Sequence, residues 1–133
     1  MDHIEKIVSG EQPLAYVIRA QLSPKQTTFL TPNDFNFQLG FVVYPAGGEV
    51  QRHLHKELER HIVGTAEVII VKVGHCEIDI YNGNRQLMAT RELGPGDVVL
   101  TVSGGHGFRM QEDTVLFEIK QGPYTGVNEK DRF

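Results

Sequence analysis

The chain has 133 residues, with 13 Lys and Arg against 17 Asp and Glu, which gives a formal net charge of −4. This length predicts one domain, residues 1–133, that buries about two thirds of the surface its unfolded chain exposes. Duplex nucleic acid and anionic membranes are not expected as main partners, because both bind clustered positive charge and the chain has no Lys/Arg block. With one cysteine, no intrachain disulfide forms. No stretch approaches the roughly 20 apolar residues that span a bilayer, so we expect a soluble, cytoplasmic protein.

Short runs rich in Val, Ile, Phe and Tyr, separated by Gly, Pro and Asn-Gly, predict an all-β sandwich or barrel. The first ten residues are compatible with a helical turn that Gly10 and Pro13 end. Strands are then expected at residues 15–19, 35–44, 49–55, 67–73, 76–81, 98–100 and 115–120. Asn82-Gly83 predicts a hairpin turn. The tail, residues 121–133, has no periodicity, and we expect it to lie over the surface or against another subunit.

Alternation along a strand predicts which side chains face the core. In the run 35–44, five apolar side chains share one face: Phe35, Phe37, Leu39, Phe41 and Val43. In the run 115–120, the apolar set Val115, Phe117 and Ile119 alternates with Glu118 and Lys120. The apolar set of each strand is expected to face inward.

Residues 49–55, EVQRHLH, place polar side chains on one strand face: Glu49, Gln51, His53 and His55. Two imidazoles at i and i+2 project to the same side, near enough to bind one divalent ion. Two ligands alone hold a metal ion poorly, so further ligands are needed. The alternative is that Val50 and Leu54 face the core, which leaves both histidines as ordinary exposed residues.

Two further residues are candidate partners for these histidines. Glu67 shares a strand face with Ile69 and Val71, where a carboxylate is costly unless it meets a cation or several donors. His106 faces inward if Phe108 and Met110 do and Arg109 points outward. The alternative for His106 is a hydrogen-bonded core histidine.

Residues 40–120 resemble the cupins, small antiparallel β-barrels of jelly-roll type that hold a metal inside. The first cupin motif is matched by Gly47, five residues and His53-Leu54-His55, and then by Glu67, six residues and Gly74. Eleven residues separate His55 from Glu67, more than the motif allows. Glu59 has the expected spacing from His55 but has Ala66 where the motif has Gly.

The second cupin motif is matched by Pro95-Gly96-Asp97 and His106. The chain departs from it in being one residue shorter, in Val102 near the proline position, and in Met110 where the motif ends with Asn. These departures are compatible with a barrel. They leave the motif a weaker guide to the position of His106 along its strand.

The resemblance implies a single antiparallel barrel with its core at about residues 35–120, and a metal held by His53, His55, Glu67 and His106. Glu59 or His61 are the alternatives to Glu67. Such ligands suit iron, manganese, nickel, copper or zinc, and the sequence does not choose among them. The resemblance also implies a homodimer.

The eleven-residue loop at residues 56–66, between His55 and Glu67, is expected to overhang the barrel mouth. Loops of this length are often functional. It carries Glu57, Glu59, Arg60 and His61. Arg60 is a candidate clamp for an anionic substrate, and His61 a candidate acid or base. Surface ion pairing is the alternative for this cluster. Gln51 is a candidate substrate contact, with a solvated strand-edge glutamine as its alternative.

The remaining residues have simpler interpretations. We expect His3 and His75 to be exposed, and Cys76 to be a small core residue. The function favoured by these residues is a metal-dependent enzyme on a small polar metabolite, either an isomerase or epimerase on a sugar or oxo acid, or a dioxygenase. A metal-anchored sensor or binding protein is the second hypothesis, and a purely structural protein without metal is the third.

Overall fold

The computed structural model describes residues 2–126 and 129–133, and the chain is organised as two compact units. The first unit comprises residues 1–22 and 65–133, and the second comprises residues 23–64. All strand pairs are antiparallel, and no helix occurs among the described residues. The all-β prediction is therefore confirmed.

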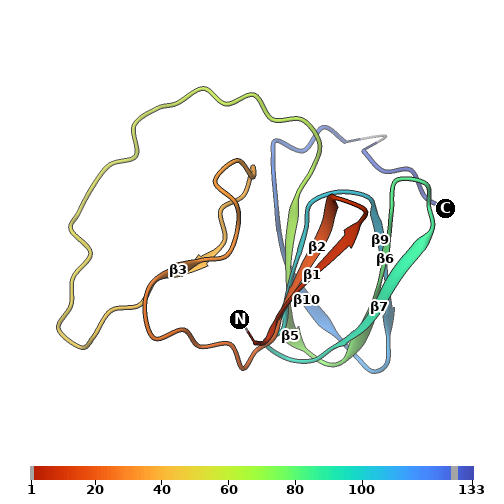
Figure 1. Cartoon of the computed structure of the whole chain (residues 1–133), viewed down its shortest axis with the longest axis horizontal. Coiled ribbons are helices and arrows are strands. Elements are labelled where there is room, and N and C mark those ends of the chain that lie inside the picture. Colours follow the sequence, from red (N-terminus) through yellow and green to blue (C-terminus); the bar gives the residue numbers. More distant parts are fainter. Residues whose placement is uncertain (1, 127–128) are drawn as a thin grey trace. The chain divides into compact units, whose positions relative to one another are not determined.

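The first unit holds two sheets (Figure 1). The five-stranded sheet has the order β1-β2-β8-β5-β10, and the three-stranded sheet has the order β7-β6-β9. The strands are β1 (Ile4–Ser9), β2 (Gln12–Ile18), β5 (Glu67–Val73), β6 (Cys76–Tyr81), β7 (Leu87–Leu93), β8 (Val98–Thr101), β9 (Gly105–Met110) and β10 (Val115–Lys120). No closed barrel is detected in the part of the chain that the structure describes.

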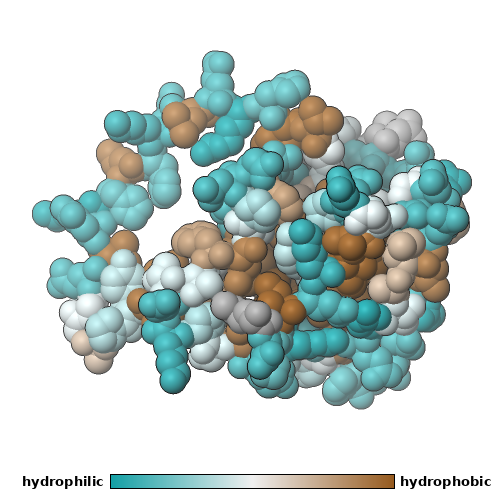
Figure 2. Space-filling model, viewed as in Figure 1, coloured by the Kyte–Doolittle hydropathy of each residue, from teal (hydrophilic) through white to brown (hydrophobic). Residues whose placement is uncertain are grey.

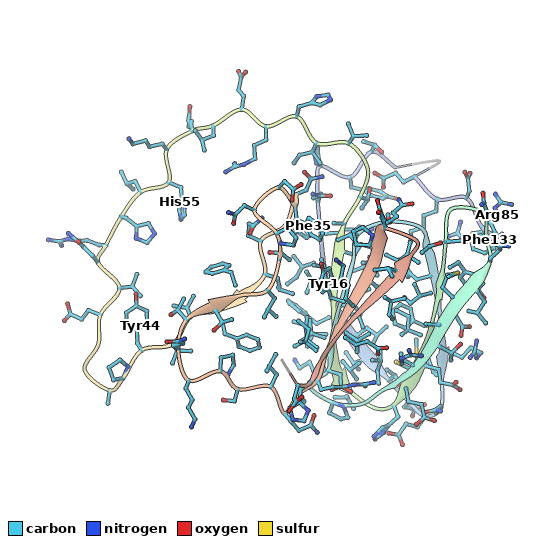
Figure 3. The ribbon with its side chains drawn as sticks, in the orientation of Figure 1. Tyr16, Phe35, Tyr44, His55, Arg85 and Phe133 are labelled. Carbon is cyan, nitrogen blue, oxygen red and sulfur yellow. The ribbon has the colours of Figure 1, made fainter. Side chains whose placement is uncertain are left out.

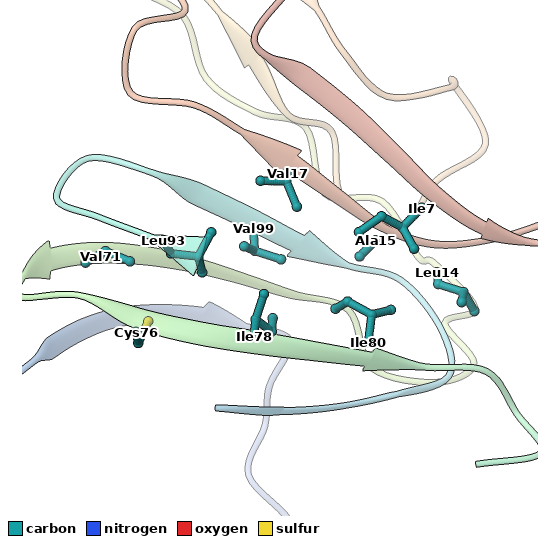
Figure 4. Packing of buried hydrophobic residues seen from close by; sticks show 10 residues of the cluster. All are labelled: Ile7, Leu14, Ala15, Val17, Val71, Cys76, Ile78, Ile80, Leu93 and Val99. Carbon is teal, nitrogen blue, oxygen red and sulfur yellow. The ribbon is translucent and has the colours of Figure 1, made fainter. Parts of the chain in front are cut away.

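Both sheets contribute to one apolar core. Its buried members are Ile7, Leu14, Ala15, Val17, Val71, Cys76, Ile78, Ile80, Leu93 and Val99 (Figure 4). Directly paired residues of neighbouring strands point to the same side of a sheet. Val17 pairs with Val99, and Val99 pairs with Ile69, so this row marks the inner face of the five-stranded sheet.

Most predicted strands of the first unit are confirmed. The ranges 67–73, 76–81 and 115–120 match β5, β6 and β10 residue for residue, and β2 and β8 cover the ranges predicted at 15–19 and 98–100 within a few residues. Asn82-Gly83 does lie in the turn between β6 and β7. There the Asn82 side chain closes the loop, its Oδ1 accepting from the backbone N–H groups of Asn84 and Gln86, both at 3.0 Å.

The helical turn expected in the first ten residues is wrong, because Ile4–Ser9 forms strand β1. Gly10 adopts a φ of 61°, which a residue without a Cβ does easily, and the chain turns back there into β2. The pairing of β1 with β2 satisfies the backbone groups that a single helical turn would leave to water.

The apolar face predicted for residues 115–120 is also wrong. Glu118 pairs with Ile69, and Lys120 pairs with Glu67, so both charged residues lie on the inner face. Phe117 and Ile119 lie on the other face and are 55% and 44% exposed. β10 is an edge strand, and its register against β5 shifts between Val115 and Leu116. Pairing with β5, rather than the strand's own hydrophobic pattern, sets its orientation.

The second unit contains one short strand pair, β3 (Thr28–Phe29) with β4 (Gly40–Phe41). The strand predicted at 35–44 is therefore wrong outside residues 40 and 41. Its first half is held in a turn instead, because the Gln38 side-chain amide donates to the carbonyl oxygens of Pro32 and Phe35 at 2.9 and 3.0 Å. Such side-chain bonds compete with strand pairing.

The strand predicted at 49–55 is wrong as well, because residues 48–63 form no helix, strand or turn. All residues from 44 to 64 are exposed. Figure 2 shows mostly hydrophilic side chains along this segment, with isolated apolar ones among them. Leu54 and Val63 are among its exposed apolar residues. No helix among the described residues is long and apolar enough to cross a membrane.

Candidate metal centre

Glu67 and His106 face each other across the interior of the first unit. Glu67, the first residue of β5, is buried, and its pairing with Thr101 and Lys120 puts it on the inner face. His106 on β9 pairs with Ile80, a core residue, and therefore points toward the five-stranded sheet. Oε2 of Glu67 lies 3.8 Å from Nε2 of His106. The inward orientation predicted for both residues is confirmed.

The electrostatics of this pair follow from its burial. Burial, and next a hydrogen bond with Glu118, raise the pKa of Glu67 from 4.5 to about 7. Burial lowers the pKa of His106, so its imidazole is neutral at pH 7. A neutral imidazole is the form that binds a metal.

The neighbours of His106 match the prediction in part. Phe108 packs against the core, and its ring centroid lies 5.9 Å from that of His106. Arg109 points outward, where its guanidinium binds the carboxylates of Asp79 and Glu77. Met110, expected inside, is half-exposed because it ends the edge strand β9.

Glu118 is the residue of this site that the sequence reasoning missed. Its carboxyl is hydrogen-bonded to that of Glu67, and this bond lowers the pKa of Glu118. It also interacts electrostatically with His106. The signal in the sequence was the apolar pattern of residues 115–120, which pointed to the wrong face; only the pairing of β10 with β5 reveals the contact.

A partly exposed ion pair between β1 and β7 shows a carboxylate neutralised by a guanidinium. There the Arg91 guanidinium binds Glu5 through two bonds, Nε to Oε1 at 2.8 Å and Nη2 to Oε2 at 2.6 Å. Among the described residues, no Lys or Arg forms a comparable ion pair with Glu67 or Glu118. Lys120 and Lys130 only lower the pKa of these carboxyls from a distance.

His53 and His55 belong to the second unit. Their ring centroids lie 5.1 Å apart, so the two imidazoles are neighbours even though they are not on a strand. Nδ1–H of His53 donates to the carbonyl oxygen of Gln51 at 2.8 Å. In a neutral ring this bond leaves the lone pair on Nε2, the arrangement common among metal-binding histidines. His55 is labelled in Figure 3.

The structure thus brings together Glu67 with His106 in one unit, and His53 with His55 in the other. Among the described residues, no three His, Cys, Asp or Glu side chains are already arranged to hold a metal ion. The loop candidates Gln51, Glu59, Arg60 and His61 are exposed in the second unit. Their roles remain predictions.

The residues to which the sequence analysis assigned no role in the site are found largely as expected. Cys76 is fully buried in the core, and this burial raises the pKa of its thiol. His75 is exposed and pairs with Glu112, with 2.5 Å between Nδ1 and Oε1. Phe133 packs on the chain's own Tyr81, with ring centroids 5.0 Å apart, and on the guanidinium of Arg85. Arg85 and Phe133 are labelled in Figure 3. Residues 127–128 of the predicted tail lie outside the described residues.

Comparisons of the chain with protein-family models, with curated proteins and with solved structures return no match.

Proposed function

We propose that this chain is a metal-binding protein of the cupin type, which binds a divalent transition metal through Glu67 and His106 and acts on a small polar metabolite. The observation that carries the proposal is the contact between these two side chains in the interior of the first unit. A carboxylate and a neutral imidazole form a ligand pair suited to iron, manganese, nickel, copper or zinc.

The geometry of the pair fits a metal ion. Zinc binds histidine nitrogen and carboxylate oxygen at about 2.1 Å, so one ion reaches both atoms when they lie less than about 4.2 Å apart. The separation of 3.8 Å between Oε2 and Nε2 meets that condition without a change of backbone.

A bound divalent ion would supply a Lewis acid that polarises a carbonyl or hydroxyl group of the substrate. The chain's own part is to position the ligands from strands β5 and β9 and to keep His106 neutral through burial. This chemistry favours an isomerase or epimerase on a sugar or oxo acid, or a dioxygenase.

The homodimer expected from the resemblance stays a prediction, which light scattering on the purified protein tests.

His53 and His55 are part of the predicted ligand set. Their proximity and the hydrogen bond that leaves Nε2 of His53 free support a role in metal binding. That they join Glu67 and His106 at one ion stays a prediction.

The test is metal binding by untagged protein, measured by elemental analysis and by titration calorimetry with Mn²⁺ and Zn²⁺. Glu67→Gln and His106→Ala are expected to lose the ion, whereas the exposed-histidine control His75→Ala keeps it. Unchanged metal content in both variants would contradict the proposal. A loss of affinity in His53→Ala and His55→Ala would support the four-residue set.

Catalysis is tested separately from metal binding. The metal-loaded protein is assayed against a panel of sugars and oxo acids for isomerisation and for oxygen uptake. Turnover that His106→Ala abolishes supports the enzyme, whereas tight ligand binding without turnover supports the sensor instead.

A further inference from the structure

We propose that strand β10 is an interface between two copies of this chain. The β10 strands of the two copies pair antiparallel about a two-fold axis at Ile119, so that Glu118 of each copy faces Lys120 of the partner subunit. This surface lies outside the pair formed by Glu67 and His106, and the proposal does not depend on metal binding. It follows from the edge position, the exposure and the order of charges of β10.

β10 is more exposed than the other edge strands of the first unit. The two sheets of this unit end in four edge strands, β1, β7, β9 and β10. Five of the six residues of β10 are exposed, against two of six in β1, three of seven in β7 and two of six in β9. Such an edge is normally shielded, because its unpaired N–H and C=O groups pair readily with another strand.

The outer face of β10 is apolar. Phe117 and Ile119 on this face are 55% and 44% exposed, and the neighbouring pair Val115 and Val73 is 51% and 52% exposed. Contiguous exposed apolar side chains mark sites of protein–protein interaction. No proline interrupts the strand, and its register shift against β5 lies between its first two residues. The rest of β10 can therefore accept another strand.

The charges of β10 favour a second copy as the partner strand. In a pair related by a two-fold axis, every contact occurs twice. An axis at Ile119 puts Glu118 opposite Lys120 twice and Ile119 opposite itself. An axis at Glu118 would place two carboxylates side by side, and like charges directly opposite each other destabilise a sheet. An axis at Phe117 would set Glu118 against the apolar Leu116. The axis at Ile119 therefore matches the charges best.

Both charged side chains can form the new pairs. Glu118 is exposed, and a carboxylate has enough lone pairs to accept from Lys120 of the partner subunit as well as from Glu67. The ammonium of Lys120 lies 5.9 Å from the centroid of the Tyr124 ring, which is itself 75% exposed, so this contact is weak and readily exchanged. The charge pairs set the register, whereas backbone hydrogen bonds and the apolar side chains supply the affinity.

Sedimentation velocity over a series of protein concentrations measures the dimer, and charge reversal tests the pairing. Glu118→Lys and Lys120→Glu are each expected to weaken the dimer by about tenfold or more, because each creates two contacts between like charges. The double variant that carries both substitutions is expected to restore the dimer, because its charge pairs are reversed but complementary. Glu92→Lys, at an exposed position on edge strand β7, is the control and is expected to dimerise like the unmodified protein.

A dimer that neither single variant weakens, or that the double variant fails to restore, would overturn the pairing of Glu118 with Lys120. An unmodified protein that stays monomeric would overturn both the interface and the expected homodimer. Circular dichroism checks the fold of each variant. If Glu118→Lys does not fold, Ile119→Asp replaces it; this variant brings two carboxylates together at the axis and is expected to lose the dimer, and an unchanged dimer would overturn the interface. A dimer that binds no metal would contradict the proposed function and leave this interface standing.

Discussion

At the scale of the residue, the proposed site depends on which side chains face the core. Glu67 was predictable from the sequence, because it starts a strand whose inner face is marked by Ile69 and Val71. His106 was predictable in the same way from Phe108. Glu118 was not, because its neighbours Phe117 and Ile119 are apolar and suggest the opposite orientation. The difference is that β5 is a central strand and β10 an edge strand.

The raised pKa of Glu67 predicts how the stability of the metal-free protein depends on pH. In the folded protein Glu67 keeps its proton up to about pH 7, whereas in the unfolded chain it loses the proton near 4.5. Glu67 therefore makes the free energy of unfolding fall as pH rises from 4.5 to 7, whereas His106, whose pKa is lowered from 6.5, makes it rise over the lower part of this range. Glu118, whose pKa is lowered, acts in the opposite direction only below 4.5.

This dependence is measured by urea unfolding in the presence of chelator at pH 5.0 and pH 7.5. In Glu67→Gln the fall in stability between the two values should be smaller than in the unmodified protein. Equal falls in both proteins would show that Glu67 does not retain a proton in the folded state.

At the scale of the element, the strands predicted correctly are those whose partners supply a matching apolar face. β6, for example, alternates Cys76, Ile78 and Ile80 toward the core, as its sequence indicates. The runs 35–44 and 49–55 have similar alternation but do not form long strands. Alternation shows what a strand would bury, and it does not show whether a neighbouring strand is available to accept its backbone hydrogen bonds. The paired histidines of 49–55 were consequently assigned to a strand face that does not exist.

The orientation of β10 predicts unequal costs of two truncations. Ile78→Ala, at a fully buried position, should lower the free energy of unfolding by about 2–5 kcal/mol. Phe117→Ala, at a position 55% exposed, should cost less than about 1.5 kcal/mol, because much of its surface already meets water.

Urea denaturation followed by circular dichroism measures both values. A cost for Phe117→Ala as large as that for Ile78→Ala would mean that Phe117 faces the core. It would then place Glu118 on the outer face, away from Glu67.

At the scale of the whole molecule, the chain combines a two-sheet unit with an apolar core and a second unit that has one short strand pair. The all-β class was predictable from the strand-like runs and from the Gly and Pro between them. The organisation into two units was not, because the loss of strand structure in 48–63 depends on which strands pair. The four-residue ligand set likewise divides between the units, two residues in each.

Exposure of the segment 44–64 predicts where a protease cuts the folded protein first. Trypsin should cleave after Arg52, Lys56 or Arg60, since exposed chain without regular structure is a preferred site of proteolysis. Lys72 and Arg91, within the strands of the first unit, should be cleaved later. Mass spectrometry of a brief digestion identifies the first cuts, and initial cleavage within β5 or β7 would contradict this account.

The most direct test of the central claim is a crystal structure of the protein loaded with one equivalent of Zn²⁺ or Mn²⁺, with data collected at the metal's absorption edge. The account predicts an anomalous peak within bonding distance of both the Glu67 carboxylate and Nε2 of His106. A fully loaded crystal whose anomalous peaks all lie away from Glu67 and His106 would contradict the claim.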